Sequence, residues 1–419
     1  RTRSPPGGAR GRGRGRTVSA GFSYHLASPP GEGGFAVFEL YGPGAAAALS
    51  GVLGGMELPG EGRVRLGVLL DEAGEQLDEV VVGRQPASAM WSGLEAFTLS
   101  LHGGAWLQER TAGLLGGLGG QVLELRGVLE LARREGALDA VQAAAFELLV
   151  ESRTDRAAGF FSRQHSGELS ELLSRCIELA GRGDGASLAE LETVLHGLVA
   201  ASLRACRLAR PLRLLIAGRA NTGKSTLFNR FLENERAAVS SQAGTTRDFI
   251  RATVAVFDYP VELVDSVGLR RRPEDPVEVE ALGWLEQEEA DGCLYLLAPP
   301  WQLEERDRSF LDGRWGKKAL IIGNKRDGAT GEPPGDSALL LSALHGDGFE
   351  ALEEAIAERW LGYGPDGSVG DDGDPAAPFT PLQLDAVEQA LSALVKTPST
   401  PLLDEVKRCL IIGLQSSWT

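Results

Sequence analysis

The segment that most constrains this chain is Gly218-Arg-Ala-Asn-Thr-Gly-Lys-Ser225, which fits the pattern G-x-x-x-x-G-K-[ST]. It follows the apolar run 212–217, which predicts a strand, and it precedes a predicted helix. In this pattern the glycines let backbone amides close around phosphates, Lys224 neutralises the β and γ charges, and the Ser225 hydroxyl reaches Mg²⁺. The segment therefore predicts a phosphate-binding loop in an α/β sheet, with adenine and guanine both left open.

Three later motifs decide between the two bases. Asp265-Ser-Val-Gly268 has the DxxG spelling, whose aspartate holds the Mg²⁺ shell and whose glycine amide senses the γ-phosphate. The Asp327 carboxylate of Asn324-Lys-Arg-Asp327 can accept the N1 and N2 protons of guanine, which adenine lacks. Ser342-Ala-Leu344 supplies an amide for the guanine O6. The motifs occur in order at predicted strand ends, so the sequence predicts a domain that binds and hydrolyses GTP.

The predicted nucleotide contacts come from these motifs and from a polar loop at 240–246. They are Gly218, Asn221, Thr222, Gly223, Lys224, Ser225, Thr226, Ser240, Ser241, Gln242, Ala243, Gly244, Thr245, Thr246, Asp265, Ser266, Val267, Gly268, Asn324, Lys325, Asp327, Ser342, Ala343 and Leu344.

The residue that follows DxxG is unusual. In Ras-type GTPases a glutamine stands there and orients the attacking water, whereas this chain has Leu269. Another group must position the water and neutralise charge. One interpretation is a K⁺ site beside the phosphates, and the other is an ordinary polar switch loop. In the first, Ser225 and Thr246 bind Mg²⁺, and the K⁺ ligands are Asn221, Ser240, Gln242 and Thr245.

The pattern of apolar residues predicts a multidomain α+β and α/β protein. Short apolar runs alternate with helical stretches after residue 211, which indicates a doubly wound parallel sheet. Helical periodicity on both sides of this sheet predicts a helical domain into which the G domain is inserted. The acidic residues of 371–374 are expected to be solvated. The predicted parts are a disordered basic tail (1–16), a β-rich N-terminal domain (17–120), a helical domain (121–210 with 379–419), a G domain (211–361) and a linker (362–378).

Composition excludes several classes of protein. A net charge of −16 argues against broad, nonspecific nucleic-acid binding. No run approaches the roughly 18 uncharged apolar residues of a membrane span. The four cysteines have no metal-ligand spacing, which suits a reducing cytoplasm. The arginine-rich start at Arg1 is expected to belong to a fragment or an over-extended start, with an RNA-binding arm as the alternative.

The spellings GRANTGKS, AGTTRD, DSVGLR, NKRD and SALHGDG together resemble the bacterial tRNA-modification GTPase family MnmE. Residues 27–34 resemble that family's ATPPGRGG segment, 101–104 its GHGG, and 136–143 its GKLDLAQA. The resemblance implies a folate-binding N-terminal domain that also dimerises, followed by the interrupted helical domain.

The resemblance also implies a mechanism. Family G domains dimerise with K⁺ bound, and K⁺ replaces an arginine finger; Asn221 and the loop 240–246 match its ligands. A glutamate after DxxGLR activates water, and this residue is Glu278, or Glu280 in an alternative alignment. The implied catalytic residues are then Glu278, Lys224 and Thr246. The implied ligands and partners are GTP or GDP, Mg²⁺, K⁺, formyl-tetrahydrofolate, tRNA, a second copy of the chain and an FAD-dependent (MnmG-like) subunit, in the cytoplasm and with no membrane.

Several positions depart from the family. The end reads RCLIIGLQSSWT in place of a terminal C-[ILV]-G-K, although Cys409 is near the right place. Glu39 replaces an arginine, Ala137 a lysine, and Leu94 a glutamate that has Glu95 beside it. Losing a cation that pairs with an anionic folate tail costs about 2–5 kcal/mol. Two hypotheses therefore stay open: a GTPase that modifies the tRNA wobble uridine, and a GTPase switch or assembly module that has lost folate binding and the modification chemistry.

Overall fold

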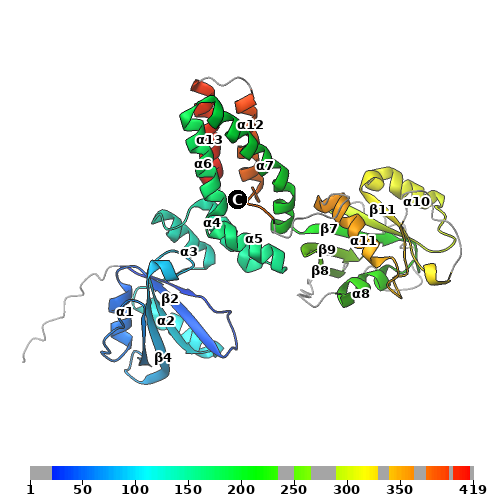
Figure 1. Cartoon of the computed structure of the whole chain (residues 1–419). Coiled ribbons are helices and arrows are strands. Elements are labelled where there is room, and N and C mark those ends of the chain that lie inside the picture. Colours follow the sequence, from blue (N-terminus) through cyan, green and yellow to red (C-terminus); the bar gives the residue numbers. More distant parts are fainter. Residues whose placement is uncertain are drawn as a thin grey trace, which may run out of the picture. The chain divides into compact units, whose positions relative to one another are not determined.

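The computed structural model describes residues 21–234, 250–265, 289–328, 339–362, 374–395 and 400–415. The chain divides into two compact units, Arg1–Asp139 and Ala140–Thr419 (Figure 1). The multidomain α+β and α/β fold predicted from the sequence is confirmed, with a sheet in each unit.

The first unit is built on a six-stranded sheet whose strand order is β3-β4-β5-β2-β1-β6. Neighbouring strands are antiparallel except β1 and β6, which are parallel. Alternate residues of β2 such as Phe38 and Leu40 pack into a core with Leu49 and Leu115 from two helices. The strands are Ser23–Leu26 (β1), Phe35–Tyr41 (β2), Arg63–Leu70 (β3), Gln76–Gln85 (β4), Ala96–His102 (β5) and Gln121–Val122 (β6).

Helices cover this sheet where the sequence suggested only strands and turns. The run that forms α1 is short and rich in alanine, and α2 lacks a clear apolar stripe, so neither shows the helical period in the sequence. The helices of the unit are Ala45–Val52 (α1), Ala105–Gly117 (α2) and Leu125–Arg134 (α3), with a helical turn at Ala87–Ala89.

The second unit contains a helical bundle made of two separate parts of the chain. Local signals set the helix starts: the Thr154 hydroxyl accepts a hydrogen bond from the Ala157 amide, and the Asp184 carboxylate accepts one from the Ser187 amide. Two C-terminal helices pack against the earlier ones, α13 on α6 and α12 on α7 (Figure 1). The helices are Ala140–Glu151 (α4), Asp155–His165 (α5), Glu168–Arg182 (α6), Gly185–Ala209 (α7), Pro381–Val395 (α12) and Thr400–Gln415 (α13).

Helix α7 is, within the described residues, the one helix long and apolar enough to cross a membrane. Its residues Leu191, Leu195 and Leu198 are buried in the core that the bundle shares with its neighbours. The apolar face is therefore explained by packing inside the unit.

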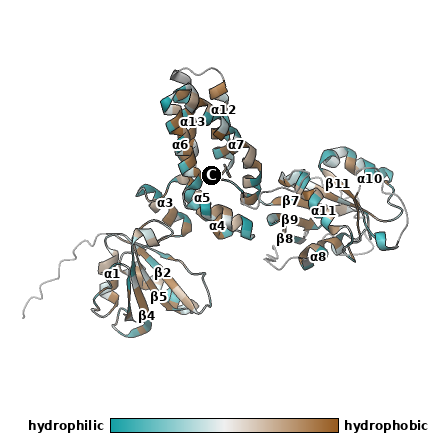
Figure 2. Cartoon of the chain, viewed as in Figure 1, coloured by the Kyte–Doolittle hydropathy of each residue, from teal (hydrophilic) through white to brown (hydrophobic). Residues whose placement is uncertain are grey.

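Along the chain, the residues of the second sheet come between the two parts of the bundle. Its strand order is β12-β11-β10-β7-β9-β8. Apolar residues are concentrated in its strands (Figure 2). Five strands are parallel as predicted, and β8 at the edge is antiparallel to β9. The strands are Leu212–Gly218 (β7), Ile250–Val256 (β8), Tyr259–Asp265 (β9), Gly292–Leu297 (β10), Ala319–Gly323 (β11) and Leu339–Leu340 (β12); the helices are Lys224–Asn234 (α8), Glu305–Phe310 (α10) and Phe349–Ile356 (α11).

The expectation that the acidic residues of 371–374 are solvated is wrong for Asp374. Its side chain is buried and accepts hydrogen bonds from the Tyr259 hydroxyl (2.7 Å), Arg156 Nη1 (3.1 Å) and Arg204 Nε (3.1 Å). Two guanidinium groups and a phenol thus compensate the desolvation of one carboxylate, which composition alone does not reveal. Residues 371–373 lie outside the described part of the chain.

Candidate nucleotide-binding site

The phosphate loop connects β7 to α8 through a tight backbone turn. Gly218 and Gly223 have positive φ angles of 137° and 95°. A Cβ on Gly218 would lie 2.3 Å from the Leu296 carbonyl oxygen, and one on Gly223 would lie 2.2 Å from Asn324 Nδ2. Only glycine fits at these two positions, which is the reason for the glycines in the motif. The loop closes onto the first turn of α8, where helix amides favour an anion.

Some polar side chains of the phosphate loop are buried and others are exposed. Lys224 is buried, and its ammonium donates to the carbonyl oxygens of Gly218 and Arg219, both at 2.8 Å. Thr222 is also buried, and its hydroxyl donates to the Arg219 carbonyl at 2.9 Å. Asn221 has a positive φ of 59° and is exposed, as are Ser225 and Thr226. The outward group offers an amide and two hydroxyls to a ligand.

Asn324 connects the phosphate loop to the base-recognition turn. Its Nδ2 donates to the Thr222 carbonyl (2.8 Å), and its Oδ1 accepts from the Ala343 amide (2.9 Å). The side chain is buried. This one amide therefore fixes the spacing between the elements that bind phosphate and those predicted to bind guanine.

The Asp327 carboxylate lies beside Ser342, whose hydroxyl donates to it at 2.5 Å. This hydrogen bond is the main reason that the pKa of Asp327 lies below its usual value. The side chain is therefore ionised at neutral pH, as an acceptor for the guanine N1 and N2 protons must be. Lys325, between the two motif ends, adopts a left-handed backbone with φ 65°.

Two residues that the sequence analysis did not single out also belong to this part of the site. Arg230 lies on helix α8, and its guanidinium donates to the carbonyl oxygens of Ala343 (3.1 Å) and Leu344. His345 Nε2 lies 3.8 Å from the Asp327 carboxylate. Arg230 lies outside the motif spellings, and His345 lies within SALHGDG without a role assigned from the sequence, so the fold reveals what each residue contacts.

Asp265 ends β9 and lies opposite Ile216 of β7 in the parallel register. It is buried. The carboxyl ends of β7, β9, β11 and β12 meet along this edge, which is where ligands bind in open α/β sheets. The described residues of the four motifs therefore lie along one edge of the sheet.

The remaining predicted residues lie outside the described part of the chain: Ser240, Ser241, Gln242, Ala243, Gly244, Thr245, Thr246, Ser266, Val267, Gly268, Glu278 and the alternative Glu280.

The first unit has a buried carboxylate at Glu39, the position where the family resemblance implies an arginine. Glu39 is buried and accepts hydrogen bonds from the Tyr41 hydroxyl (2.5 Å) and Trp91 Nε1 (3.2 Å). Burial, and then the charge of Glu39, raise the pKa of Tyr41. Glu95 forms an ion pair with Arg84 at 2.6 Å. An anionic ligand would meet a buried negative charge here.

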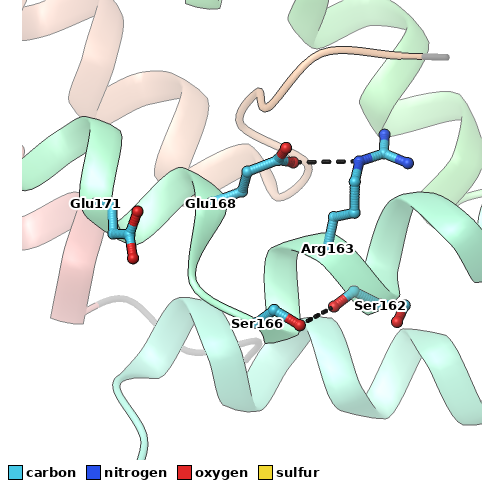
Figure 3. A pocket seen from close by; sticks show the side chains of 5 residues that line it. All are labelled: Ser162, Arg163, Ser166, Glu168 and Glu171. Carbon is cyan, nitrogen blue, oxygen red and sulfur yellow. Dashed lines mark hydrogen bonds and ion pairs between the residues drawn. The ribbon is translucent and has the colours of Figure 1, made fainter. Parts of the chain in front are cut away.

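A separate polar hollow lies between α5 and α6 (Figure 3). It is lined by Ser162, Arg163, Ser166, Glu168 and Glu171. Its two carboxylates outnumber its one guanidinium group: Arg163 pairs with Glu168 at 3.3 Å, and Glu171 adds a further negative charge. Ser166 Oγ donates to the Ser162 carbonyl at 3.0 Å. We therefore place the nucleotide at the sheet edge and not here.

Comparisons with known proteins agree with this geometry. The family model described as a 50S ribosome-binding GTPase matches residues 213–325. A tRNA modification GTPase MnmE from Moorella thermoacetica is 31% identical over 383 residues, covering 80% of this chain and 81% of that protein. The chain belongs to the tRNA modification GTPase MnmE family. The MnmE of Aquifex aeolicus is 30% identical over 362 residues, with 80% and 81% covered.

Membership of this family and the matched GTPase model identify the chain as a GTP hydrolase. The G domain of the T. maritima FeoB transporter covers 35% of this chain at a TM-score of 0.27 and 21% identity, which is too low to add to the assignment.

Proposed function

We propose that this member of the MnmE family is a K⁺-stimulated GTPase of the wobble-uridine modification type, active as a dimer in the cytoplasm. The proposal of K⁺ stimulation depends on the position of Asn221. Asn221 lies on the phosphate loop, where its side chain is exposed and its backbone is left-handed (φ 59°). An amide oxygen at that place is a suitable ligand for a hard cation. Leu269 stands where Ras-type enzymes have the glutamine that orients the attacking water, so another group must position that water.

We propose one role at the nucleotide for each of these described residues. Lys224 balances phosphate charge, the Ser225 hydroxyl on the first turn of α8 is a Mg²⁺ ligand, and Asp265 at the end of β9 supports the Mg²⁺ shell. Asn324 and Asp327 select guanine. From the family resemblance, we propose Thr246 as the second Mg²⁺ ligand, Glu278 for activation of water, and Ser240, Gln242 and Thr245 as the other K⁺ ligands.

Dimerisation is supported by an apolar face on the first unit. Val64, Leu66 and Val68 alternate along β3 and are 62%, 74% and 37% exposed, although β3 is an edge strand. Leu66 lies opposite Val81 of β4, which is 40% exposed. Exposed apolar residues gathered on one face favour burial against another protein surface. A second copy of this chain is the proposed partner, with tRNA and the FAD-dependent (MnmG-like) subunit as further partners by family resemblance.

The second candidate function is a GTPase switch or assembly module without folate chemistry. Glu39 favours it, because a buried carboxylate stands where the family has a cation, and its hydrogen bonds come from Tyr41 and Trp91. Calorimetric titration with formyl-tetrahydrofolate separates the two candidates: saturable binding contradicts the switch. Failure to restore wobble-uridine modification in a bacterial strain lacking its own MnmE contradicts the modification reading.

The main test compares steady-state GTP hydrolysis in KCl and NaCl at equal ionic strength. We expect at least an approximately tenfold higher rate in KCl, because K⁺ takes the place of an arginine finger. Asn221→Ala should remove this difference. Asn229→Ala, an exposed asparagine on α8, is the matched control and should keep it. Equal wild-type rates in the two salts would refute the cation mechanism and leave GTP hydrolysis itself in place.

A further inference from the structure

The segment between β10 and α10 contacts the guanine-recognition motif through Trp301. Trp301 in this segment is 1% exposed and has a left-handed backbone with φ 55°. Its ring packs on Gly323, where an added Cβ would lie 3.3 Å from the indole Cδ1. Its Nε1–H donates a hydrogen bond of 2.7 Å to the main-chain carbonyl of Asn324. The Trp301 side chain therefore contacts the motif backbone at two neighbouring residues, Gly323 and Asn324.

The residue that Trp301 supports is the one that joins the parts of the site. Asn324 uses its amide nitrogen on the Thr222 carbonyl and its amide oxygen on the Ala343 amide. Both hydrogen bonds depend on the direction of the Asn324 side chain, and this direction depends on its main chain. A shift of the Asn324 carbonyl would also move Asp327, three residues further along the same turn.

The other end of the same segment is fixed to the phosphate loop. Arg219 forms ion pairs with Glu304 and, at 3.4 Å, with Asp307, and its Nη2 donates to the Gln302 carbonyl at 3.1 Å. Asp307 is 1% exposed and also accepts a hydrogen bond from the Tyr295 hydroxyl at 2.6 Å. Residues 301–307 thus contact both halves of the nucleotide site.

We propose that Trp301 is a positioning residue for guanine recognition. Through the Asn324 carbonyl it holds the Asn324–Asp327 turn in the geometry that reads the base, while Arg219 joins the same segment to the phosphate loop. The proposal concerns base selection only. It rests on the guanine-nucleotide site and does not depend on K⁺, folate or tRNA.

A second tryptophan in the same core provides a matched control. Trp315 is fully buried and stacks on Phe310, with ring centroids 6.2 Å apart. Within the described residues its Nε1 has no hydrogen-bond partner. Tryptophan-to-phenylalanine substitution therefore removes core volume at both positions, and removes a contact to the base-recognition turn at Trp301 alone.

The experiment measures the dissociation constants of GDP and inosine diphosphate for the wild type, Trp301→Phe and Trp315→Phe. Inosine diphosphate lacks the guanine 2-amino group, so the ratio of the two constants reports the alignment of Asp327. We expect Trp301→Phe to weaken GDP binding about tenfold and to reduce this ratio, because a buried carbonyl loses its donor. KM for GTP should rise while kcat stays close to the wild-type value. Trp315→Phe should lower the melting temperature and leave the ratio unchanged.

An unchanged ratio in Trp301→Phe, or an equal fall in both variants, would overturn the proposal. A wild-type protein that does not bind GDP would instead contradict the nucleotide site itself. A measurement that needs no variant covers the case in which Trp301→Phe does not fold. With ¹⁵N-labelled tryptophan, GDP should shift the indole resonance of Trp301 in the wild type and leave that of Trp315 in place. Equal behaviour of the two resonances would also refute the positioning role.

Discussion

Removing the Asp374 carboxylate is expected to destabilise the second unit strongly. In Asp374→Ala the Tyr259 hydroxyl, on a fully buried side chain, loses its acceptor. Arg156 and Arg204, whose side chains are 23% and 26% exposed, lose the charge between them. Breaking a buried ion pair from one side costs about 3–5 kcal/mol. Because both guanidinium groups retain some contact with water, we expect about 3 kcal/mol, near the lower limit.

Urea denaturation, followed by circular dichroism, measures this loss of free energy in the transition of the second unit. Asp374→Asn should cost less, about 1–2 kcal/mol, since an amide oxygen still accepts from the Tyr259 hydroxyl. Glu190→Ala is the control, because its ion pair with Arg175 is exposed and worth at most about 1 kcal/mol. If Asp374→Ala and Glu190→Ala unfold at the same urea concentration, the reasoning about a buried cluster is refuted.

Three further predictions concern the site and the core. The lowered pKa of Asp327, due first to the Ser342 hydrogen bond, means that GDP affinity is retained at neutral pH and is lost as pH falls through that pKa. Ser342→Ala should move this loss to higher pH in a fluorescence titration. Burial raises the pKa of Cys176 to about 11, so a disulfide reagent at neutral pH should modify it only after urea unfolds the chain. Gly292→Ala would place a Cβ 2.5 Å from the Trp360 ring and should cost about 1–3 kcal/mol in urea denaturation, against no measurable change for Gly60→Ala, which faces open space.

The sequence predicted those parts of the site whose residues stand close together in short motifs. Gly218 and Gly223 are needed because an added Cβ would lie 2.3 and 2.2 Å from neighbouring atoms, and a motif records that requirement position by position. The strand ends followed from apolar runs of the right length, which place Asp265 and Asn324 along one edge.

What the sequence did not predict depends on contacts between distant residues. Trp301 is 23 positions from its hydrogen-bond acceptor, Asn324, and Asp374 is 115 positions from Tyr259. No local pattern marks either pair, and the acidic surroundings of Asp374 suggested a solvated chain. Helices α1 and α2 were missed for a different reason, since tertiary packing forms them without an amphipathic period.

The surroundings of Glu39 show why a single substitution at this position would not create an anion site in the first unit. Two groups donate to its carboxylate, the Tyr41 hydroxyl and Trp91 Nε1–H. Since Trp91 Nε1–H can only donate, an arginine at position 39 would find only the Tyr41 oxygen as an acceptor among these two groups. Burying that cation beside them would carry the cost of an uncompensated charge. Anion binding at this place would therefore require changes both at the glutamate and at the groups that donate to it. The nucleotide site has no such dependence, since each described group that shapes it comes from residues 212–345. GTP hydrolysis can thus persist in this chain whatever the first unit binds.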